Sequence, residues 1–253
     1  MAYVRLDMGN FMANQQKLVT VSVWRGDEAQ GEFESFEVPF VEDQTILDLL
    51  THIQRSIDSS LSYRFACRVG MCGSCAMRVN GKPRWTCRTL VSKALVDGQI
   101  KLEPLSNLPV VKDLVVDMEP FFDKWQKAKG RFEPKKSLVQ EFAPIKPNNI
   151  QRQLADAAIE CINCGICYSA CDVVESNPDY LGPAALNRAW SLANDERDGA
   201  GIERLQAVSG DGGCQNCHTN SQCAARCPIQ LNPTRSIAGL KKKVAVAMLK
   251  GEL

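Results

Sequence analysis

The chain has 253 residues, of which 45% are hydrophobic, and it carries 30 Lys and Arg against 29 Asp and Glu. This length suits two small domains, and the balanced charge gives no reason to expect a nucleic-acid partner. No apolar run approaches the roughly 20 residues that a membrane helix needs, and residues 1–17 lack the apolar core and the twin-arginine pair of an export signal.

The first half of the chain is predicted to form a small sheet around a helix. Valines alternate with polar residues over 19–23, the period of a half-buried strand, and residues 32–38 can return as a second strand. Apolar residues then repeat at helical spacing over 46–57, behind polar residues at 43–45 that can cap a helix. His52 lies away from the apolar stripe of this helix, so we expect a solvated side chain there.

The first cysteine group follows this helix. Because no export signal is visible, we expect a reducing compartment, in which the twelve cysteines are metal ligands rather than disulfide partners. Cys67, Cys72 and Cys75 have the C-x4-C-x2-C spacing of plant-type [2Fe–2S] proteins. Gly70 and Gly73 fit such a loop, since backbone that wraps around a cluster needs positive φ angles and points N–H groups at the sulfurs.

A β-hairpin is predicted to supply the fourth ligand of this group. Residues 76–79 form its first strand, Asn80-Gly81 is a strong type I′ turn, and the returning strand delivers Cys87. Four thiolates also suit zinc. Zinc sites usually pair C-x2-C units, however, so the spacing favours [2Fe–2S].

A transition follows this domain. Residues 113–125 are predicted to form a helix that is interrupted at Pro120, with apolar anchors on one side. Basic residues crowd the stretch 124–136, which we interpret as a solvated connector rather than a docking patch. Pro144 and Pro147 mark the end of the linker.

The second half contains two ferredoxin-type runs. Cys161 to Cys171 is a bacterial C-x2-C-x2-C-x3-C run, in which the fourth cysteine of each run ligates the other cluster. Cys217 to Cys227-Pro228 repeats this spacing, but Asn220 stands where the second cysteine belongs. A cubane that lacks one thiolate readily lacks the iron which that thiolate would hold, so one of the two sites is predicted to be a [3Fe–4S] cluster.

The crossing rule assigns the ligands of both clusters. The [4Fe–4S] ligands are Cys161, Cys164, Cys167 and Cys227, and the [3Fe–4S] ligands are Cys171, Cys217 and Cys223. Cys214 is left over. Its C-x2-C spacing to Cys217 would allow it to bind a metal, but every site is filled without it, so we expect a free or buried thiol.

Two longer helices are predicted among these cysteines. One begins at Gly182-Pro183 and runs through Asn194, with an apolar face for the core. The other begins at Asn232-Pro233 and runs to about Leu249, following the pattern of a cap and then a proline. Lysines 241–243 on the second helix are expected to solvate one face.

The combination of a plant-type cluster domain with a ferredoxin domain that lacks one cysteine resembles the iron–sulfur subunit of succinate dehydrogenase and fumarate reductase. The segments that carry the resemblance are Cys67 to Cys75, Asn80 to Pro83, Cys161 to Cys171, Gly182 to Ala184 and Asn232 to Arg235. The match covers nearly the whole chain after its first residues.

This resemblance implies an α+β protein, with a plant-type ferredoxin (β-grasp) domain followed by an all-α bacterial ferredoxin-type domain. The expected divisions are an N-terminal extension at 1–16, the [2Fe–2S] domain at 17–120, a linker at 121–149, and a helical domain with the [4Fe–4S] and [3Fe–4S] clusters at 150–253.

In function, the resemblance implies an electron relay. The expected order is FAD, [2Fe–2S], [4Fe–4S], [3Fe–4S], then quinone or haem b. The FAD belongs to a flavoprotein subunit that performs the chemistry, succinate to fumarate with quinone reduction or the reverse. The quinone and haem belong to a membrane cytochrome b or anchor subunit, which would hold this chain on the cytoplasmic side of the cell membrane.

Four positions refine this resemblance. Asp172 stands where many members of the family have proline, and Ser176 stands where ubiquinone-using members have tryptophan. Cys217-His218 matches the family's Cys-His beside the [3Fe–4S] cluster, and Lys241 matches a lysine that faces the membrane subunit. The pattern is more similar to menaquinone-type members with a dihaem cytochrome b. His218 and Lys241 are therefore candidates for the vicinity of quinone or a haem propionate, although His218 could equally cap a loop near the cluster.

Two other classes of protein stay open. One is a soluble two-domain ferredoxin-like carrier without a membrane complex. The other is the iron–sulfur subunit of a different flavoprotein, such as a thiol-linked fumarate reductase, whose extra cysteine-rich repeats this chain lacks. A carrier should purify alone, whereas the subunit should purify with an FAD protein and a haem protein.

Overall fold

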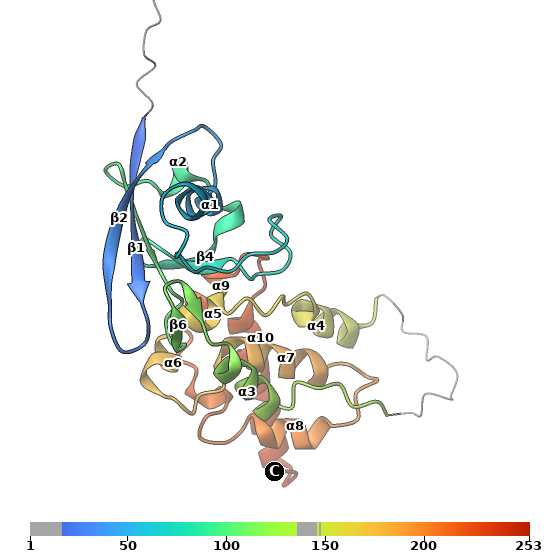
Figure 1. Cartoon of the computed structure of the whole chain (residues 1–253). Coiled ribbons are helices and arrows are strands. Elements are labelled where there is room, and N and C mark those ends of the chain that lie inside the picture. The colour runs from blue at the N-terminus through green and yellow to red at the C-terminus, as the bar shows by residue number, and fades with distance from the viewer. Residues whose placement is uncertain (1–16, 136–145, 147) are drawn as a thin grey trace, which may run out of the picture.

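The computed structural model describes residues 17–135, 146 and 148–253. Three predictions concern residues outside this described part: the N-terminal extension at 1–16, the absence of an export signal there, and the linker prolines Pro144 and Pro147. The chain forms two halves, a sheet crossed by α1 (Ile46–Ser56) and a group of helices below it (Figure 1). This division agrees with the predicted α+β class.

Five strands form a mixed sheet in the first half, in the spatial order β2-β1-β5-β3-β4. They are β1 (Leu18–Gly26), β2 (Gly31–Pro39), β3 (Ala76–Val79), β4 (Lys82–Trp85) and β5 (Gln99–Glu103). The pair β1 and β5 is parallel, and the other neighbours are antiparallel. Two short helices follow β4, namely η1 (Thr86–Arg88) and α2 (Val91–Ala94). A sheet that wraps one helix in this way is the predicted β-grasp arrangement.

The apolar side chains of α1 and of the strands form the core of this half. The valines of 19–23 are fully buried against the helix, as their alternation predicted. Thr45 caps α1 through a reciprocal pair of hydrogen bonds, because its Oγ1 accepts from the Asp48 N–H at 3.3 Å and the Asp48 carboxylate accepts from the Thr45 N–H at 3.0 Å. The helix ends one residue before Ile57, which is exposed, so the expectation that Ile57 extends the apolar stripe was wrong. His52 is partly exposed.

The prediction of one interrupted helix over 113–125 was also wrong. Residues 110–116 form a strand pair, β6 (Val110–Lys112) and β7 (Val115–Val116), and α3 (Glu119–Lys127) begins only afterwards. Asp113 explains the difference, because its carboxylate accepts from the Gly26 N–H at 3.1 Å and from the Ser62 N–H at 2.8 Å, which holds it against the sheet. Pro120 lies in the first turn of α3, a position where the missing N–H costs nothing.

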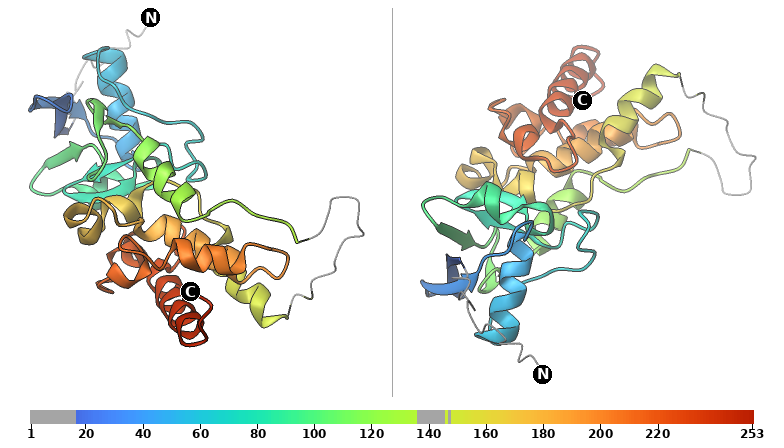
Figure 2. Two further views of the ribbon diagram at one scale, coloured as in Figure 1. Left: turned by 90° about the horizontal axis from the view of Figure 1, so that it is seen from below. Right: turned by 90° about the horizontal axis from the view of Figure 1, so that it is seen from above.

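The second half is all helical within the described residues. Its helices are α4 (Ile150–Ile159), α5 (Ile166–Ser169), α6 (Asp172–Ser176), α7 (Gly182–Ala193), α8 (Gly201–Ala207), η2 (Cys214–Asn216), α9 (Gln222–Arg226) and α10 (Pro233–Leu249). The bounds of α7 and α10 confirm the two predicted helices. The central helix α7 packs against α4 and α10, and α10 lies at the end of the molecule far from α1 (Figure 2). No described helix is both long and apolar enough to span a bilayer.

Residues on both sides of the predicted linker boundary pack into this helical half. Leu105, Leu108 and Phe121 belong to its core rather than to the core of the sheet. The Lys124 ammonium is buried and donates to the carbonyl of Pro178. The interpretation of the basic stretch as a solvated connector was therefore wrong at Lys124, because the helical half covers this side chain.

A buried ion pair anchors the segment after α3. Both carboxylate oxygens of Asp198 accept from Arg204 Nη2, at 2.8 and 2.7 Å, and neither side chain is more than 1% exposed. Arg204 also donates to the Arg131 carbonyl at 3.2 Å, and Asp198 accepts from the Glu133 N–H at 3.0 Å.

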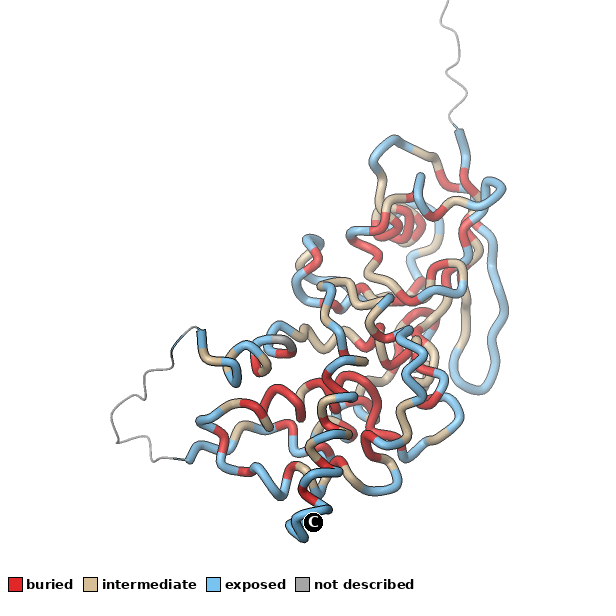
Figure 3. The backbone as a smooth tube through the Cα atoms, turned by 180° about the vertical axis from the view of Figure 1, so that it is seen from behind, coloured by how far each residue is buried: buried red, intermediate tan, exposed pale blue. Residues whose placement is uncertain are grey.

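The two halves meet in a buried junction. Buried residues, red in Figure 3, occur in both halves and in the region between them. Helix α5 contacts β4 there, and Ser169 Oγ accepts from the Ser106 N–H at 2.9 Å. All three cysteine groups lie on loops and short helices near this junction.

Candidate metal centres

The first loop points backbone N–H groups at sulfur. The N–H groups of Met71 and Cys72 donate to Cys67 Sγ at 3.2 and 3.3 Å. Gly70 and Gly73 have φ angles of 76° and 72°, which confirms that the loop needs positive φ at these two positions. Hydrogen bonds from the backbone of Val69, then of Met71 and Cys72, lower the pKa of Cys67 to about 6. The loop is therefore built to stabilise a thiolate.

The hairpin brings the fourth thiol to this loop. Asn80-Gly81 forms the predicted turn with both φ angles positive, and Cys87 follows in η1. Cys75 and Cys87 are buried beside each other, whereas Cys72 is exposed. Burial, together with the neighbouring Cys75 thiol, raises the pKa of Cys87 to about 12. A thiol with such a pKa ionises only beside added positive charge, which a metal centre supplies.

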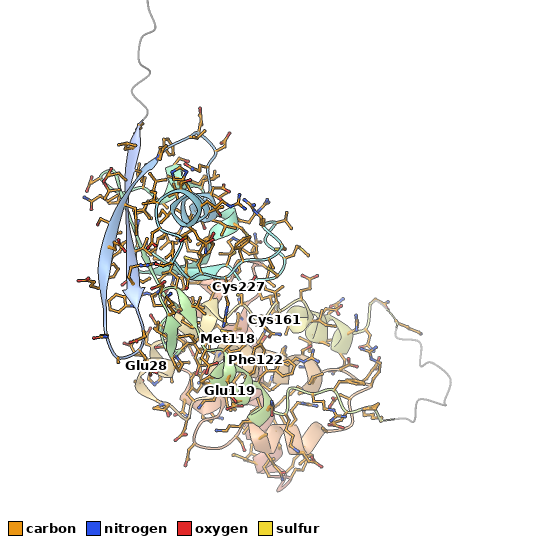
Figure 4. The ribbon with its side chains drawn as sticks, in the orientation of Figure 1. Glu28, Met118, Glu119, Phe122, Cys161 and Cys227 are labelled. Atoms are coloured by element: carbon orange, nitrogen blue, oxygen red, sulfur yellow. The ribbon has the colours of Figure 1, made fainter. Side chains whose placement is uncertain are left out.

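A second group of four thiols lines one cavity. Its members are Cys161, Cys164, Cys167 and Cys227. Cys227 belongs to the second run, yet it lies beside Cys161 of the first (Figure 4). Burial raises the pKa of Cys164 to about 12 and also raises the pKa of Cys161 and Cys167. Neutral thiols in an apolar cavity are suited to a metal cluster that ionises them on binding.

The three remaining cysteines of the two runs also lie together. Burial raises the pKa of Cys171 and Cys223, and each is further raised by the charge of Cys217. The phenol of Tyr180, 1% exposed, lies at the same group, where burial and the neighbouring thiols of Cys217 and Cys171 raise its pKa. The hydroxyl of Thr234 lies 3.3 Å from Cys223 Sγ. The structure thus brings together each set of cysteines that the crossing rule paired.

Cys214 and Asn220 are neighbours of the third group that the crossing rule does not count as ligands. Cys214 has no exposed surface and packs in the core of the helical half, the environment of a buried thiol. Asn220 is exposed, and its Nδ2 donates to Asp172 Oδ2 at 2.6 Å. The amide that replaces the missing cysteine therefore links its loop to the first turn of α6.

The structure brings His218 and Lys241 to the third group. Lys241 Nζ donates to the carbonyl of Cys217 at 2.7 Å. His218, the next residue in the chain, is exposed. Lys241 holds the loop that carries Cys217, and the exposed imidazole stands on the rim of the third group.

The first and second groups touch. A Cβ atom added to Gly73 would lie 2.5 Å from Cys164 Cβ and 3.0 Å from its Cα, so no side chain fits between the two loops. A cavity of about 390 Å³ opens beside this contact and is lined by Met118, Phe122 and Cys164, among others. In Figure 4 the labelled Met118 and Phe122 lie just below Cys161. The glycine thus lets two cysteine groups from distant parts of the chain approach closely.

Cysteine thiols are the side chains that gather in each of the three groups. No three His, Cys, Asp or Glu side chains among the described residues are placed to hold a single metal ion. The donors are all soft thiols, and backbone N–H groups face some of them. Such a donor set fits an iron–sulfur cluster, which is held by cysteine thiolates and tuned by N–H donors.

Sequence reasoning missed two polar side chains at these groups. Tyr180 lies at the third group, two residues before the predicted helix, and Asn187 lies at the second group, between the core positions of that helix. For Asn187, the available signal was a polar residue between the core positions of a helix, but an exposed side chain would give the same sequence pattern.

Two protein families match the two halves. Residues 20–123 match the 2Fe-2S iron-sulfur cluster binding domain, and residues 160–232 match the 4Fe-4S dicluster domain. The chain is 35% identical to the fumarate reductase iron-sulfur subunit of Mycobacterium tuberculosis, over 92% of this chain and 94% of that protein. It is 36% identical to the mitochondrial succinate dehydrogenase (ubiquinone) iron-sulfur subunit 1 of Oryza sativa subsp. japonica, over 78% and 70%.

A solved structure agrees with these relatives. A chain of the Mycobacterium smegmatis Sdh1 complex in the apo form superposes with a TM-score of 0.84 at 26% identity, covering 91% of this chain and 96% of that one. The resemblance predicted from the cysteine spacing is therefore confirmed. The chain belongs to the family of iron–sulfur subunits of succinate dehydrogenase and fumarate reductase, with a [2Fe–2S] domain in its first half and a dicluster domain in its second.

Proposed function

We propose that the three cysteine groups hold three clusters and that the chain relays electrons between an FAD-containing subunit and a membrane subunit. The ligands are Cys67, Cys72, Cys75 and Cys87 for [2Fe–2S], Cys161, Cys164, Cys167 and Cys227 for [4Fe–4S], and Cys171, Cys217 and Cys223 for [3Fe–4S]. When bound, these clusters supply one-electron steps between the flavin, where succinate or fumarate reacts, and quinone.

The observation that carries the proposal is the placement of the three groups in series. The Gly73 loop of the first group packs on Cys164 of the second. Cys167 of the second group is close enough to Cys223 of the third for the charge on Cys223 to raise its pKa. The middle group therefore has a neighbour on each side, which supports a chain of electron carriers from the first group to the third.

We place the quinone end at the third group. Exposed His218 and the Lys241 contact to the Cys217 carbonyl support a site there for quinone or a haem propionate. Exposed Met248 and Leu249 at the end of α10 add apolar surface that a membrane cytochrome b or anchor would cover. The subunit would then lie peripherally on the cytoplasmic side of the cell membrane. Ser176 in place of tryptophan favours the menaquinone type with dihaem cytochrome b.

Purification under native conditions tests this proposal. A tag on this chain should recover an FAD protein and a haem b protein, with about nine irons per copy of the chain if all three clusters are present. EPR should show a [3Fe–4S] signal in the oxidised sample, and two further signals on reduction. Recovery of the chain alone, with its clusters intact, would favour a two-domain ferredoxin carrier instead. An FAD partner without haem would favour another flavoprotein.

A further inference from the structure

Asn187 is a buried polar residue whose hydrogen bonding is incomplete. It lies in the middle of α7, its side chain is 1% exposed, and its Oδ1 has no hydrogen-bond partner among the described residues. An unpaired buried amide group lowers the stability of the fold, so natural proteins rarely keep one without a reason. The position of this residue indicates the reason.

The side chain of Asn187 lines the same cavity as the four thiols of the second group. Ala184, one turn earlier on the same face of α7, lines it as well. Other polar side chains of α7 are bonded elsewhere: Arg188 Nε donates to the Gly130 carbonyl at 3.0 Å, and Ser191 Oγ donates to the Ala155 carbonyl at 2.8 Å. The other amide of this lining is Asn163, whose Oδ1 accepts from Cys161 Sγ at 3.7 Å, and the remaining residues besides the cysteines are apolar. Asn187 thus places an incompletely bonded amide beside the four thiols.

The chemistry of an amide suits a sulfur-rich neighbour. Its oxygen and nitrogen are interchangeable by a half turn of the last side-chain bond, so the unbonded position can present two N–H donors. Thiolate and sulfide carry negative charge, which increases when the cluster is reduced. Hydrogen-bond donors stabilise that reduced form more than the oxidised form and so raise the reduction potential.

We propose that Asn187 is a positioning and tuning residue of the second centre, which donates an amide hydrogen bond to its sulfur atoms and raises its reduction potential. The inference rests on the proposed function, since it requires the [4Fe–4S] cluster in this cavity. It assigns to one side chain of α7 a property that the cysteine ligands alone do not set. No electron passes through the amide, and no bond of it is broken.

The test is a redox titration of the purified native complex, monitored by EPR. In Asn187→Leu, which keeps the approximate volume and removes the donors, the ratio of reduced to oxidised second centre should fall about tenfold at fixed potential, which corresponds to about 59 mV for a one-electron couple. The potentials of the first and third centres should not change. Asn187→Ala, which cannot overpack the cavity, should also lower the potential and serves if the Leu variant does not assemble.

The matched control is Asn194→Leu. Asn194, the C-terminal cap of α7, is also buried, and its Oδ1 has no partner among the described residues. It does not line the cavity, and its Nδ2 donates to the Trp190 carbonyl at 2.7 Å. This variant should lose stability without any shift in potential. An unchanged second-centre potential in an Asn187 variant that retains the cluster overturns the inference. Absence of a [4Fe–4S] signal from the unsubstituted complex would instead overturn the proposed function.

Discussion

The contact between Gly73 and Cys164 leads to a quantitative prediction. In Gly73→Ala, the new methyl group meets Cys164 at 2.5 Å, and the residue must also keep a φ of 72°. The backbone term costs about 1–2 kcal/mol. Overpacking between the loops adds about 1–3 kcal/mol, because the atoms it meets belong to a short, constrained cysteine loop.

Gly98→Ala separates these two terms. Gly98 has a φ of 77°, but no atom of the described residues lies within 4 Å of an added Cβ, so this control has the backbone cost alone. The assay is urea-induced bleaching of cluster absorbance in the purified complex, under identical conditions for both variants. With a slope of about 1–3 kcal/mol per molar urea, the midpoint of Gly73→Ala should lie about 1 M below that of Gly98→Ala.

The same variants also test the electron path. Gly73→Ala should weaken the magnetic interaction between the first and second centres in the reduced EPR spectrum, because the two loops must separate. Gly98→Ala should leave that interaction unchanged. Equal urea midpoints and equal spectra for the two variants would refute the reasoning, since the loops would then tolerate a methyl group between them.

Three further predictions concern the second half. Asn220→Cys removes the hydrogen bond between Asn220 and Asp172 and should convert the third centre from [3Fe–4S] toward [4Fe–4S], with a lower reduction potential and slower quinone reduction. A full-strength EPR signal in the oxidised sample, with unchanged iron content, would contradict the ligand assignment. Cys214→Ser should leave the EPR signals of all three clusters intact. It should lower the free energy of unfolding by about 1–3 kcal/mol, because it places a hydroxyl group in the core. Selective loss of the [3Fe–4S] signal would show that Cys214 is a ligand. Arg204→Met should cost about 3–5 kcal/mol in urea unfolding, because it leaves the Asp198 carboxylate buried without its cation. The exposed ion pair of Lys129 and Glu203 provides the control for Arg204→Met, because Lys129→Met should cost no more than about 1 kcal/mol. Similar losses of stability in the two variants would refute the argument that the buried pair is the more costly one to break.

The sequence by itself determined the features that depend on neighbours along the chain. The C-x4-C-x2-C loop with its two glycines, the Asn80-Gly81 turn and the proline after the Asn232 cap are local signals, because ligand spacing, turn type and helix start are decided within a few residues. The repeated spacing of the two ferredoxin runs also predicted a crossed grouping of their cysteines, and the same cysteines lie near one another in the structure.

Tertiary structure decided what depends on contacts between distant residues. The local sequence predicts a helix at Asp113, but its carboxylate accepts hydrogen bonds from Gly26 and Ser62 and so belongs to a strand pair. The local sequence likewise predicts a solvated Lys124, but the helical half covers this side chain. Tertiary packing also decides the contact of Gly73 with Cys164 and the position of Asn187 in the lining of the second group's cavity. Burial and long-range hydrogen bonds form only when the two halves pack together, so local propensity and spacing contain no signal for them.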